Sequence, residues 1–191
     1  MANLEGKILE SLKHDRLIRE GHVAYSSGRH SAALLDPDHL TTNPVAVGHM
    51  SYAIAKHFFT DHIQTVASPS LQGAALAIWV GHFLDPVARV VPAAMTADGP
   101  AVPRQLDDLV VDRRVILIDD LIVSGDLIRP LLQSVEAHGG EVIGIAALWN
   151  VGDPEIAGHP VFGLLNTVYD VWPQADCPLC AAGEPAIDAG Y

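Results

Sequence analysis

Positive charge is scarce in this chain. Its 191 residues include 11 lysines and arginines against 23 aspartates and glutamates, which gives a formal net charge of -12 at pH 7. Nucleic-acid binding needs a basic surface, so we expect no nucleic-acid partner. A site for a polyanion would also have few cations to use. Lysine occurs only at Lys7, Lys13 and Lys56, and the cations that follow are Arg89, Arg104, Arg113, Arg114 and Arg129.

Long apolar runs are absent as well. The sequence contains no run of about 18 apolar residues, so we expect neither a membrane-spanning helix nor a membrane partner. The opening stretch MANLEGKILE has no basic region followed by a long apolar segment, so we expect no signal peptide. The expected location is therefore the cytoplasm.

Cysteine is limited to Cys177 and Cys180. Two cysteines this close together exclude a secreted scaffold held by long-loop disulfides. A Cys-x-x-Cys pair can supply half of a tetrahedral zinc site, and the other half would have to come from histidines or a second subunit. The alternative is a tight surface turn with two reduced thiols. Among the histidines, His30 stands out because it adjoins Arg29, whereas the others are expected to pack or face solvent.

Helical and strand-like patterns alternate along the chain. Residues 3–19 have apolar side chains at helical spacing, and residues 22–35 look extended with a turn at SSGRHS. Thr42-Asn43-Pro44 is typical of a helix start. We further expect helices at 44–59, 73–84 and 126–138, strands at 63–68, 86–91, 114–120, 141–150 and 161–167, and a long loop at 92–112. On the helix at 73–84, Trp79 and Phe83 are expected in the core.

This alternation predicts an α/β fold with an open, mostly parallel twisted sheet flanked by helices. The expected organisation is an N-terminal helix and small hood at 1–40, a core at 41–172, and a Cys-x-x-Cys segment and tail at 173–191.

The stretch VILIDDLIVSGDLI, residues 115–128, points to a site. A buried-looking strand ends on Asp119 and Asp120, and the next residues turn into a helix N-terminus. Ligands of open parallel sheets bind at the carboxyl ends of the strands. Adjacent carboxylates there suit a ribose diol or a magnesium-bound sugar phosphate, and free amides at the helix start bind phosphate. The alternative is a solvated acidic turn.

Four motifs together resemble the type I phosphoribosyltransferases, and orotate phosphoribosyltransferases in particular. VILIDDLIVSGD is similar to their phosphoribosyl-pyrophosphate (PRPP) motif, SSGRHS to their early Ser-Gly-Arg segment, VASPSLQGAALA to their pyrophosphate loop, and CPLCAAGEP to a C-terminal segment of some members. The resemblance implies a homodimer that uses PRPP and Mg²⁺ and transfers phosphoribosyl to a nucleobase.

The resemblance also implies roles for individual residues. Asp119 and Asp120 would hold the ribose hydroxyls or magnesium, and Arg89 would sit near the pyrophosphate. Together these three would be the catalytic residues. PRPP would be bound by the remaining matched residues: Arg29, Ser68, Pro69, Ser70, Leu71, Gln72, Gly73, Val123, Ser124, Gly125 and Asp126.

Several positions depart from the family pattern. Val123 offers no hydroxyl, Trp149-Asn150 stands where the family has Asp-Arg, and Arg104 is the only cation in the loop. A carboxylate of Asp126 about 4 Å from a phosphate charge would cost on the order of 4 kcal/mol at an effective dielectric near 20. Asp126 is also a good N-cap, and could occupy the amides that a phosphate needs.

Two hypotheses follow. One is an active transferase with an altered acceptor. The other is a catalytically degenerate relative that binds a nucleotide or metabolite, or acts as a subunit. The geometry around Asp126 discriminates between them.

Overall fold

A computed structural model describes residues 2–14, 16–36, 39–40, 42–85, 87–166 and 169–189. Its main sheet has the strand order β4-β3-β7-β8-β10-β9. The strands from β4 to β10 are mutually parallel, and short β9 runs antiparallel to β10 at the edge. The predicted mostly parallel sheet is therefore confirmed. The strands are β3 (Thr65–Ser68), β4 (Arg89–Pro92), β7 (Arg114–Ile122), β8 (Glu141–Asn150), β9 (Glu155–Ile156) and β10 (His159–Asn166).

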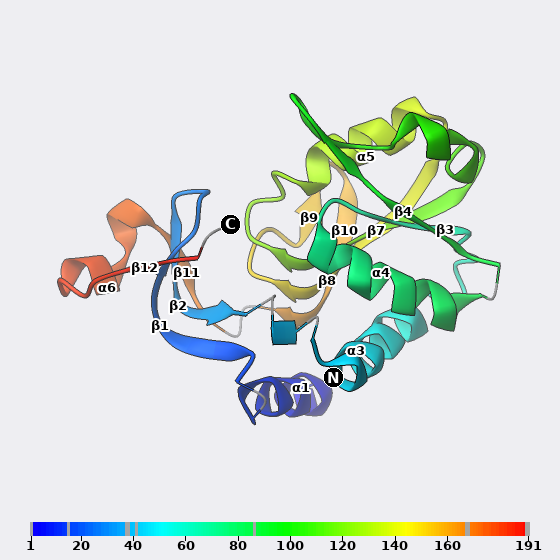
Figure 1. Ribbon diagram of the computed structural model, residues 1–191. Helices are drawn as coiled ribbons and strands as arrows, with labels where there is room; N and C mark the ends of the chain where they lie inside the picture. Colours follow the sequence, from blue (N-terminus) through cyan, green and yellow to red (C-terminus); the bar gives the residue numbers. More distant parts are fainter. Residues whose placement is uncertain are drawn as a thin grey trace.

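Helices cover both faces of this sheet. Along β7, Ile116 and Ile118 join the cluster that contains α3 (Pro44–His57) and α4 (Leu71–Leu84), because alternate strand residues point to opposite faces. Val115 and Leu117 instead join the cluster beneath α5 (Ile128–Ala137). Figure 1 shows α5 on the side of the sheet away from α3 and α4. Two-sided burial explains why the strands are apolar throughout.

The start of α3 follows its sequence signature. The Asn43 side chain accepts a hydrogen bond from the Ala46 backbone N–H at 3.1 Å, and Pro44 occupies the first turn.

The hood is a second sheet, built from both ends of the chain. Its strand order is β11-β2-β1-β12, with β1 (Ile18–Ala24) and β2 (Arg29–Leu35) flanked by β11 (Val171–Pro173) and β12 (Ile187–Asp188). Between β11 and β12 lie a 3-10 turn, η2 (Gln174–Asp176), and the short helix α6 (Pro178–Ala181). The segment 173–191, expected to end in a loose tail, thus contributes β12 at one edge of the hood, and β11 at the other edge ends where the segment begins.

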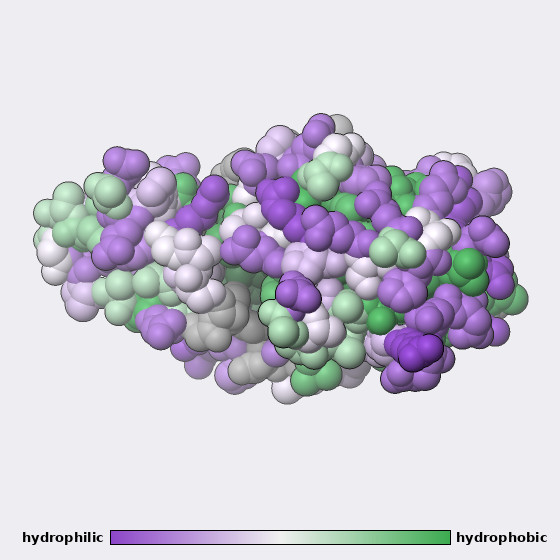
Figure 2. All heavy atoms as spheres, turned by 90° about the horizontal axis from the view of Figure 1, so that it is seen from above, coloured by the Kyte–Doolittle hydropathy of each residue, from purple (hydrophilic) through white to green (hydrophobic). Residues whose placement is uncertain are grey.

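The hood forms a lobe of its own. In Figure 1, α6 lies at its outer end, α1 (Ala2–His14) lies below it, and the carboxyl ends of β7 and β8 point toward it. Figure 2 shows the same two lobes from above, with a largely hydrophilic face on the wider one. Within the described ranges, no helix is both long enough and apolar enough to cross a membrane.

The long loop expected at 92–112 contains regular structure. β5 (Ala94–Thr96) and β6 (Gly99–Ala101) form an antiparallel hairpin, followed by the 3-10 helix η1 (Arg104–Leu109). Ala97 and Asp98 form the turn, and Gly99, with a φ of +111°, begins β6 directly after it. The Ser134 hydroxyl on α5 accepts a hydrogen bond from the Val102 N–H at 2.9 Å. Strands this short leave too few residues for alternation to be visible in the sequence.

Trp79 also departs from its expected place, because 36% of it is exposed. It stacks on Phe83 with ring centroids 6.0 Å apart, and Phe83 is half-buried at the edge of the core. Because α4 is apolar on all sides, its sequence does not show which side faces solvent.

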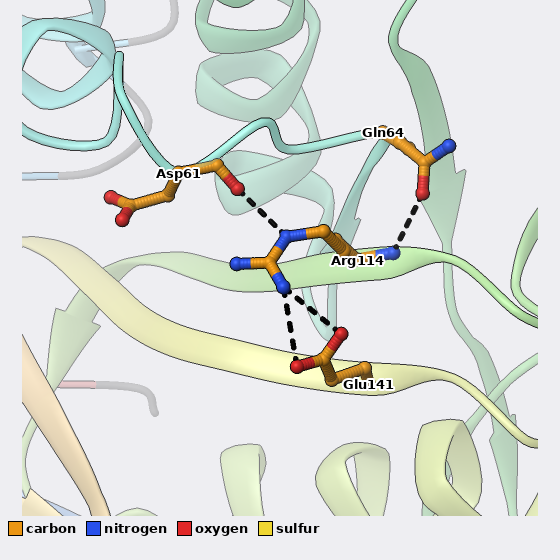
Figure 3. A network of polar contacts seen from close by, with 4 residues as sticks. All are labelled: Asp61, Gln64, Arg114 and Glu141. Carbon is orange, nitrogen blue, oxygen red and sulfur yellow. Dashed lines mark hydrogen bonds and ion pairs between the residues drawn. The ribbon is translucent and has the colours of Figure 1, made fainter.

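Arg114 connects three chain segments at the amino end of the sheet. Its Nε donates to the Asp61 carbonyl at 2.8 Å, its Nη1 lies 3.1 Å from the Glu141 carboxylate, and its backbone N–H donates to the Gln64 side chain at 3.1 Å (Figure 3). This cation is therefore used structurally, at the edge of the sheet opposite Asp119.

Two substitutions on α4 test the assigned core. Leu76 is 1% exposed and Ile78 is 60% exposed. We expect Leu76→Ala to lower the free energy of unfolding by about 2–5 kcal/mol, because it opens a cavity. The matched surface change, Ile78→Ala, should shift it by no more than about 0.5 kcal/mol. Urea denaturation measures both, and equal losses would contradict the assignment.

Candidate functional site

A buried carboxyl stands at the end of the central strand. Asp119, on β7, is 3% exposed. The Ser70 hydroxyl, at the N-cap of α4, donates to Asp119 Oδ1 at 2.5 Å and accepts from the Gly73 N–H at 2.8 Å. Gly73 leaves room for this arrangement, since a Cβ there would lie 2.6 Å from Asp119 Oδ1. The predicted pyrophosphate loop and the predicted carboxylate are thus in direct contact.

Burial raises the pKa of Asp119 well above its usual range, and the neighbouring Asp120 charge raises it further. The hydrogen bond from Ser70 acts in the opposite direction. Asp120 is 7% exposed, and its backbone N–H donates to Asp119 Oδ1 at 3.1 Å. A pair of buried carboxyls of this kind favours a ligand that brings hydroxyl donors or a cation.

At the end of β7 the chain turns sharply over residues 121–126, of which the first two still belong to the strand. Gly125 has a φ of +78°, where side chains are strained, and an added Cβ would lie 2.9 Å from Ile156 Cδ1. The end of β8 supports the turn, because the Val151 and Gly152 N–H groups donate to the Ile122 carbonyl at 2.9 and 3.2 Å. The 121–126 turn is therefore held by packing and backbone hydrogen bonds on its inner side.

Of the two arrangements left open for Asp126, the structure does not show the one in which it caps the following helix. Helix α5 begins at Ile128, and among the described residues no side chain caps its first turn. Asp126 Oδ2 instead accepts a hydrogen bond from the Ser124 hydroxyl at 2.7 Å. The carboxylate lies two residues before the helix, where this hydroxyl is the nearer donor. The amides at the start of α5 are consequently not occupied by the Asp126 side chain.

A cavity of about 250 Å³ joins this turn to the hood. One wall is Asp119 and residues 121–128, and the other is Tyr25, Ser26 and Ser27 from the turn between β1 and β2. We call residues 25–28 the hood turn. The structure therefore brings the Ser-Gly-Arg segment and the PRPP-like motif to opposite sides of one cavity.

Two predicted site residues lie elsewhere. Arg89 starts β4 and pairs with Thr65 at the amino end of the sheet, where it borders a separate cavity of about 550 Å³ with Arg113 and Arg114. Arg89 lies three residues before the end of β4 at Pro92, away from Asp119, so its expected place near the pyrophosphate stays a prediction. Arg29 begins β2 opposite Pro173, and it is not among the described residues that line the cavity of the 121–126 turn.

The pyrophosphate-loop residues divide by exposure. Ser68 is fully buried, with its hydroxyl donating to the Ser70 carbonyl at 3.1 Å, whereas Leu71 is 83% exposed. Pro69, just before α4, is buried, and Gln72, in the first turn of α4, is half-buried.

Sequence reasoning gave no role to Arg129, which the structure places beside the 121–126 turn. A Cβ on Gly125 would lie 3.7 Å from Arg129 Nε. The signal was its spacing of four residues from Gly125, which is one helical turn. Trp149 and Asn150, by contrast, act structurally. Trp149 is fully buried, and Asn150 Oδ1 accepts from the Gly152 N–H at 3.1 Å, which holds the loop that supports the turn.

Comparison with known proteins bears on this arrangement. No family model matches the chain. An orotate phosphoribosyltransferase of Thermus thermophilus is 27% identical over 179 residues, 93% of this chain and 97% of that protein. One from Caldicellulosiruptor bescii is 26% identical over 183 residues, 95% of each.

Solved structures agree. Mycobacterium tuberculosis orotate phosphoribosyltransferase superposes with a TM-score of 0.64 at 21% identity, covering 85% of this chain and 96% of that one. The adenine phosphoribosyltransferase of Thermoanaerobacter pseudethanolicus gives 0.64 at 20% identity, covering 83% and 99%. This chain has the type I phosphoribosyltransferase fold. Its similarity to orotate phosphoribosyltransferases, expected from the four motifs, is confirmed over nearly the whole chain.

The buried state of Asp119 gives a pH test. Its pKa is raised on folding, so the folded state binds more protons than the unfolded one at pH values above about 3.9. Stability contributed by this group must then fall as pH rises through that window. We expect Asp119→Asn to be more stable than the unsubstituted protein at pH 7, with the gap closing toward pH 4.

Thermal unfolding at several pH values measures this gap. Asp98→Asn, at an exposed position in the β5–β6 turn, is the matched control and should show no pH-dependent gap. A difference for Asp119→Asn that stays constant with pH would contradict the assignment.

Proposed function

We propose that this protein is a phosphoribosyltransferase that binds PRPP and transfers its phosphoribosyl group to a nucleobase. One observation carries the proposal: the PRPP-like motif forms a strand, turn and helix start along a cavity, and the Asp126 side chain does not cap the first turn of that helix. Orotate is the first acceptor to test, because the relatives that match nearly the whole chain are orotate phosphoribosyltransferases.

The 5'-phosphate is assigned to the 121–126 turn. Backbone amides at a helix N-terminus attract anions. Gly125 has a positive φ, which favours glycine, and glycine adds no side chain to the turn. Arg129 Nε adds a cation beside the same turn. Together they offset the carboxylate of Asp126, whose oxygen is already engaged by Ser124.

Asp119 is assigned to the ribose and to magnesium. Its carboxyl lines the cavity, and both burial and Asp120 oppose its ionisation, so a divalent cation would relieve both effects. Magnesium usually binds through one or two carboxylates together with substrate phosphates, which this residue set fits. When bound, the metal would supply charge that stabilises the departing diphosphate. The chain's own part is to orient the ribose with Asp119 and to close the cavity with the hood turn.

The acceptor and the assembly belong to the proposal as well. Because Trp149 and Asn150 are used structurally, contacts to the base must come from other residues, and the hood turn faces the cavity. A homodimer, with segment 92–112 reaching the neighbouring site, is the assembly that the family resemblance implies. A helix start blocked by Asp126 would have favoured the degenerate alternative, and no such cap is present.

Titration calorimetry of PRPP with and without Mg²⁺ tests the binding site. We expect saturable, magnesium-dependent binding. Arg129→Gln should weaken it by about tenfold or more, because a hydrogen bond to a charged group contributes roughly 1.5–3 kcal/mol.

Arg89→Gln is the matched control. It removes the same charge at the opposite end of the sheet, so binding should stay within about twofold of the unsubstituted protein, as expected for a site that touches no ligand. Absence of binding at millimolar PRPP would refute the proposal. Weakening by Arg89→Gln alone would place the phosphate site elsewhere.

A further inference from the structure

Four potential metal ligands from distant parts of the chain converge in the hood. His22 lies on β1, His30 on β2, and Cys177 and Cys180 on the segment between β11 and β12. One ligand atom from each lies within 4.8 Å of all the others. We propose that these four residues form a structural zinc site.

The distances suit tetrahedral coordination. The Sγ atoms of Cys177 and Cys180 each lie 3.6 Å from His22 Nε2, and Cys180 Sγ lies 3.3 Å from His30 Nδ1. Zn–S bonds of about 2.3 Å and Zn–N bonds of about 2.0 Å at tetrahedral angles place N and S about 3.5 Å apart. His22 Nε2 and His30 Nδ1 are 2.8 Å apart, so the rings must separate by roughly 0.5 Å to reach the spacing that the same bond lengths require.

A hydrogen bond orients His22 for this role. Its Nδ1 lies 2.7 Å from the backbone carbonyl of Glu184, so Nδ1 carries the proton and donates it. Nε2 then carries the lone pair, and it faces His30 Nδ1 and both cysteine sulfurs. Zinc-binding histidines are commonly fixed by a hydrogen bond of this kind from the other ring nitrogen.

Burial and charge also favour zinc over a surface turn. His22, His30 and Cys177 are 5%, 6% and 2% exposed, and Cys180 is partly buried. Two thiolates and two neutral imidazoles form a neutral complex with Zn²⁺, which can be buried at little electrostatic cost. Because all four positions are taken by protein atoms, the site is closed and structural rather than catalytic.

The path of the chain shows what the ion would hold together. β11 pairs with β2 at Trp172 and His30, and β12 pairs with β1 at Val23 and Ile187, on opposite edges of the hood. The cysteine segment crosses from one edge to the other. A shared ion would fasten this crossing segment to both central strands, and so join the two ends of the chain.

The ion would also fix the hood turn. Tyr25, Ser26 and Ser27 lie between His22 and His30 in the sequence and form one wall of the cavity. Loss of zinc is therefore expected to loosen that wall and to weaken PRPP binding. This last consequence rests on the proposed function, whereas the metal content of the protein does not.

Elemental analysis of the full-length protein, purified without a metal-affinity step, tests the site. We expect one zinc per chain. Cobalt substitution should give the visible spectrum of a tetrahedral thiolate complex. Removal of zinc with a chelator should lower Tm by about 10 °C, because a ligand that binds only the folded state stabilises it by mass action.

Variants make the test specific. Cys177→Ser combined with Cys180→Ser, and separately His22→Asn, should each lose the zinc. The control His62→Asn, at an exposed histidine outside the cluster, should retain it. If a variant fails to fold, zinc content and the chelator effect on the unsubstituted protein still decide the question.

Three results would overturn the proposal: a protein free of zinc whose Tm a chelator does not change, a stable disulfide between Cys177 and Cys180, or zinc retained by the double cysteine variant. Zinc present without PRPP binding would refute only the proposed function. PRPP binding without zinc would refute only the metal site.

Discussion

The hydrogen bond between Ser70 and Asp119 is the contact around which the site is arranged. It joins the end of β7 to the first turn of α4, and so fixes two of the three segments that meet at the carboxyl edge of the sheet. Gly73 has to lack a side chain for the contact to form. A carboxyl placed this deeply resists ionisation, and it is best satisfied by donors or a cation that a ligand brings. The same burial that lowers stability at neutral pH therefore prepares the strand end for a polar ligand.

The hood depends on a different kind of closure. Its central strands come from the N-terminal part of the chain and its edge strands from the C-terminal part. The edge strands have only three and two residues, yet they hold together segments that are far apart in sequence. Strand pairs of two or three residues provide little stability alone. The His22, His30, Cys177 and Cys180 cluster lies where these segments cross, and a metal there would supply the missing constraint.

Much of the fold was predictable because its signals are local. The strand at 141–150 matches β8 to the residue, and Asn43-Pro44 marks the start of α3. Pairings across long sequence distances were not predictable. His22 and Cys177 are 155 positions apart, and nothing in either neighbourhood indicates the other. The position of Arg89 relative to the site could not be read from the sequence, because the length of β4 decides which edge of the sheet it reaches. The partner of Asp126 was left open, because the choice between Ser124 and the helix amides depends on the local geometry of the turn.

The small number of cations is the main constraint on the chemistry. Arg114 is tied to Glu141 and Asp61, and Arg89 faces the opposite edge, which leaves Arg129 beside the 121–126 turn. Transfer would therefore rely on backbone amides, a single arginine and substrate-bound magnesium. Release of pyrophosphate from magnesium-bound PRPP, followed in the presence and absence of orotate and other nucleobases, tests this most directly. We expect release that depends on one particular base. Binding of PRPP without release for any base would contradict it.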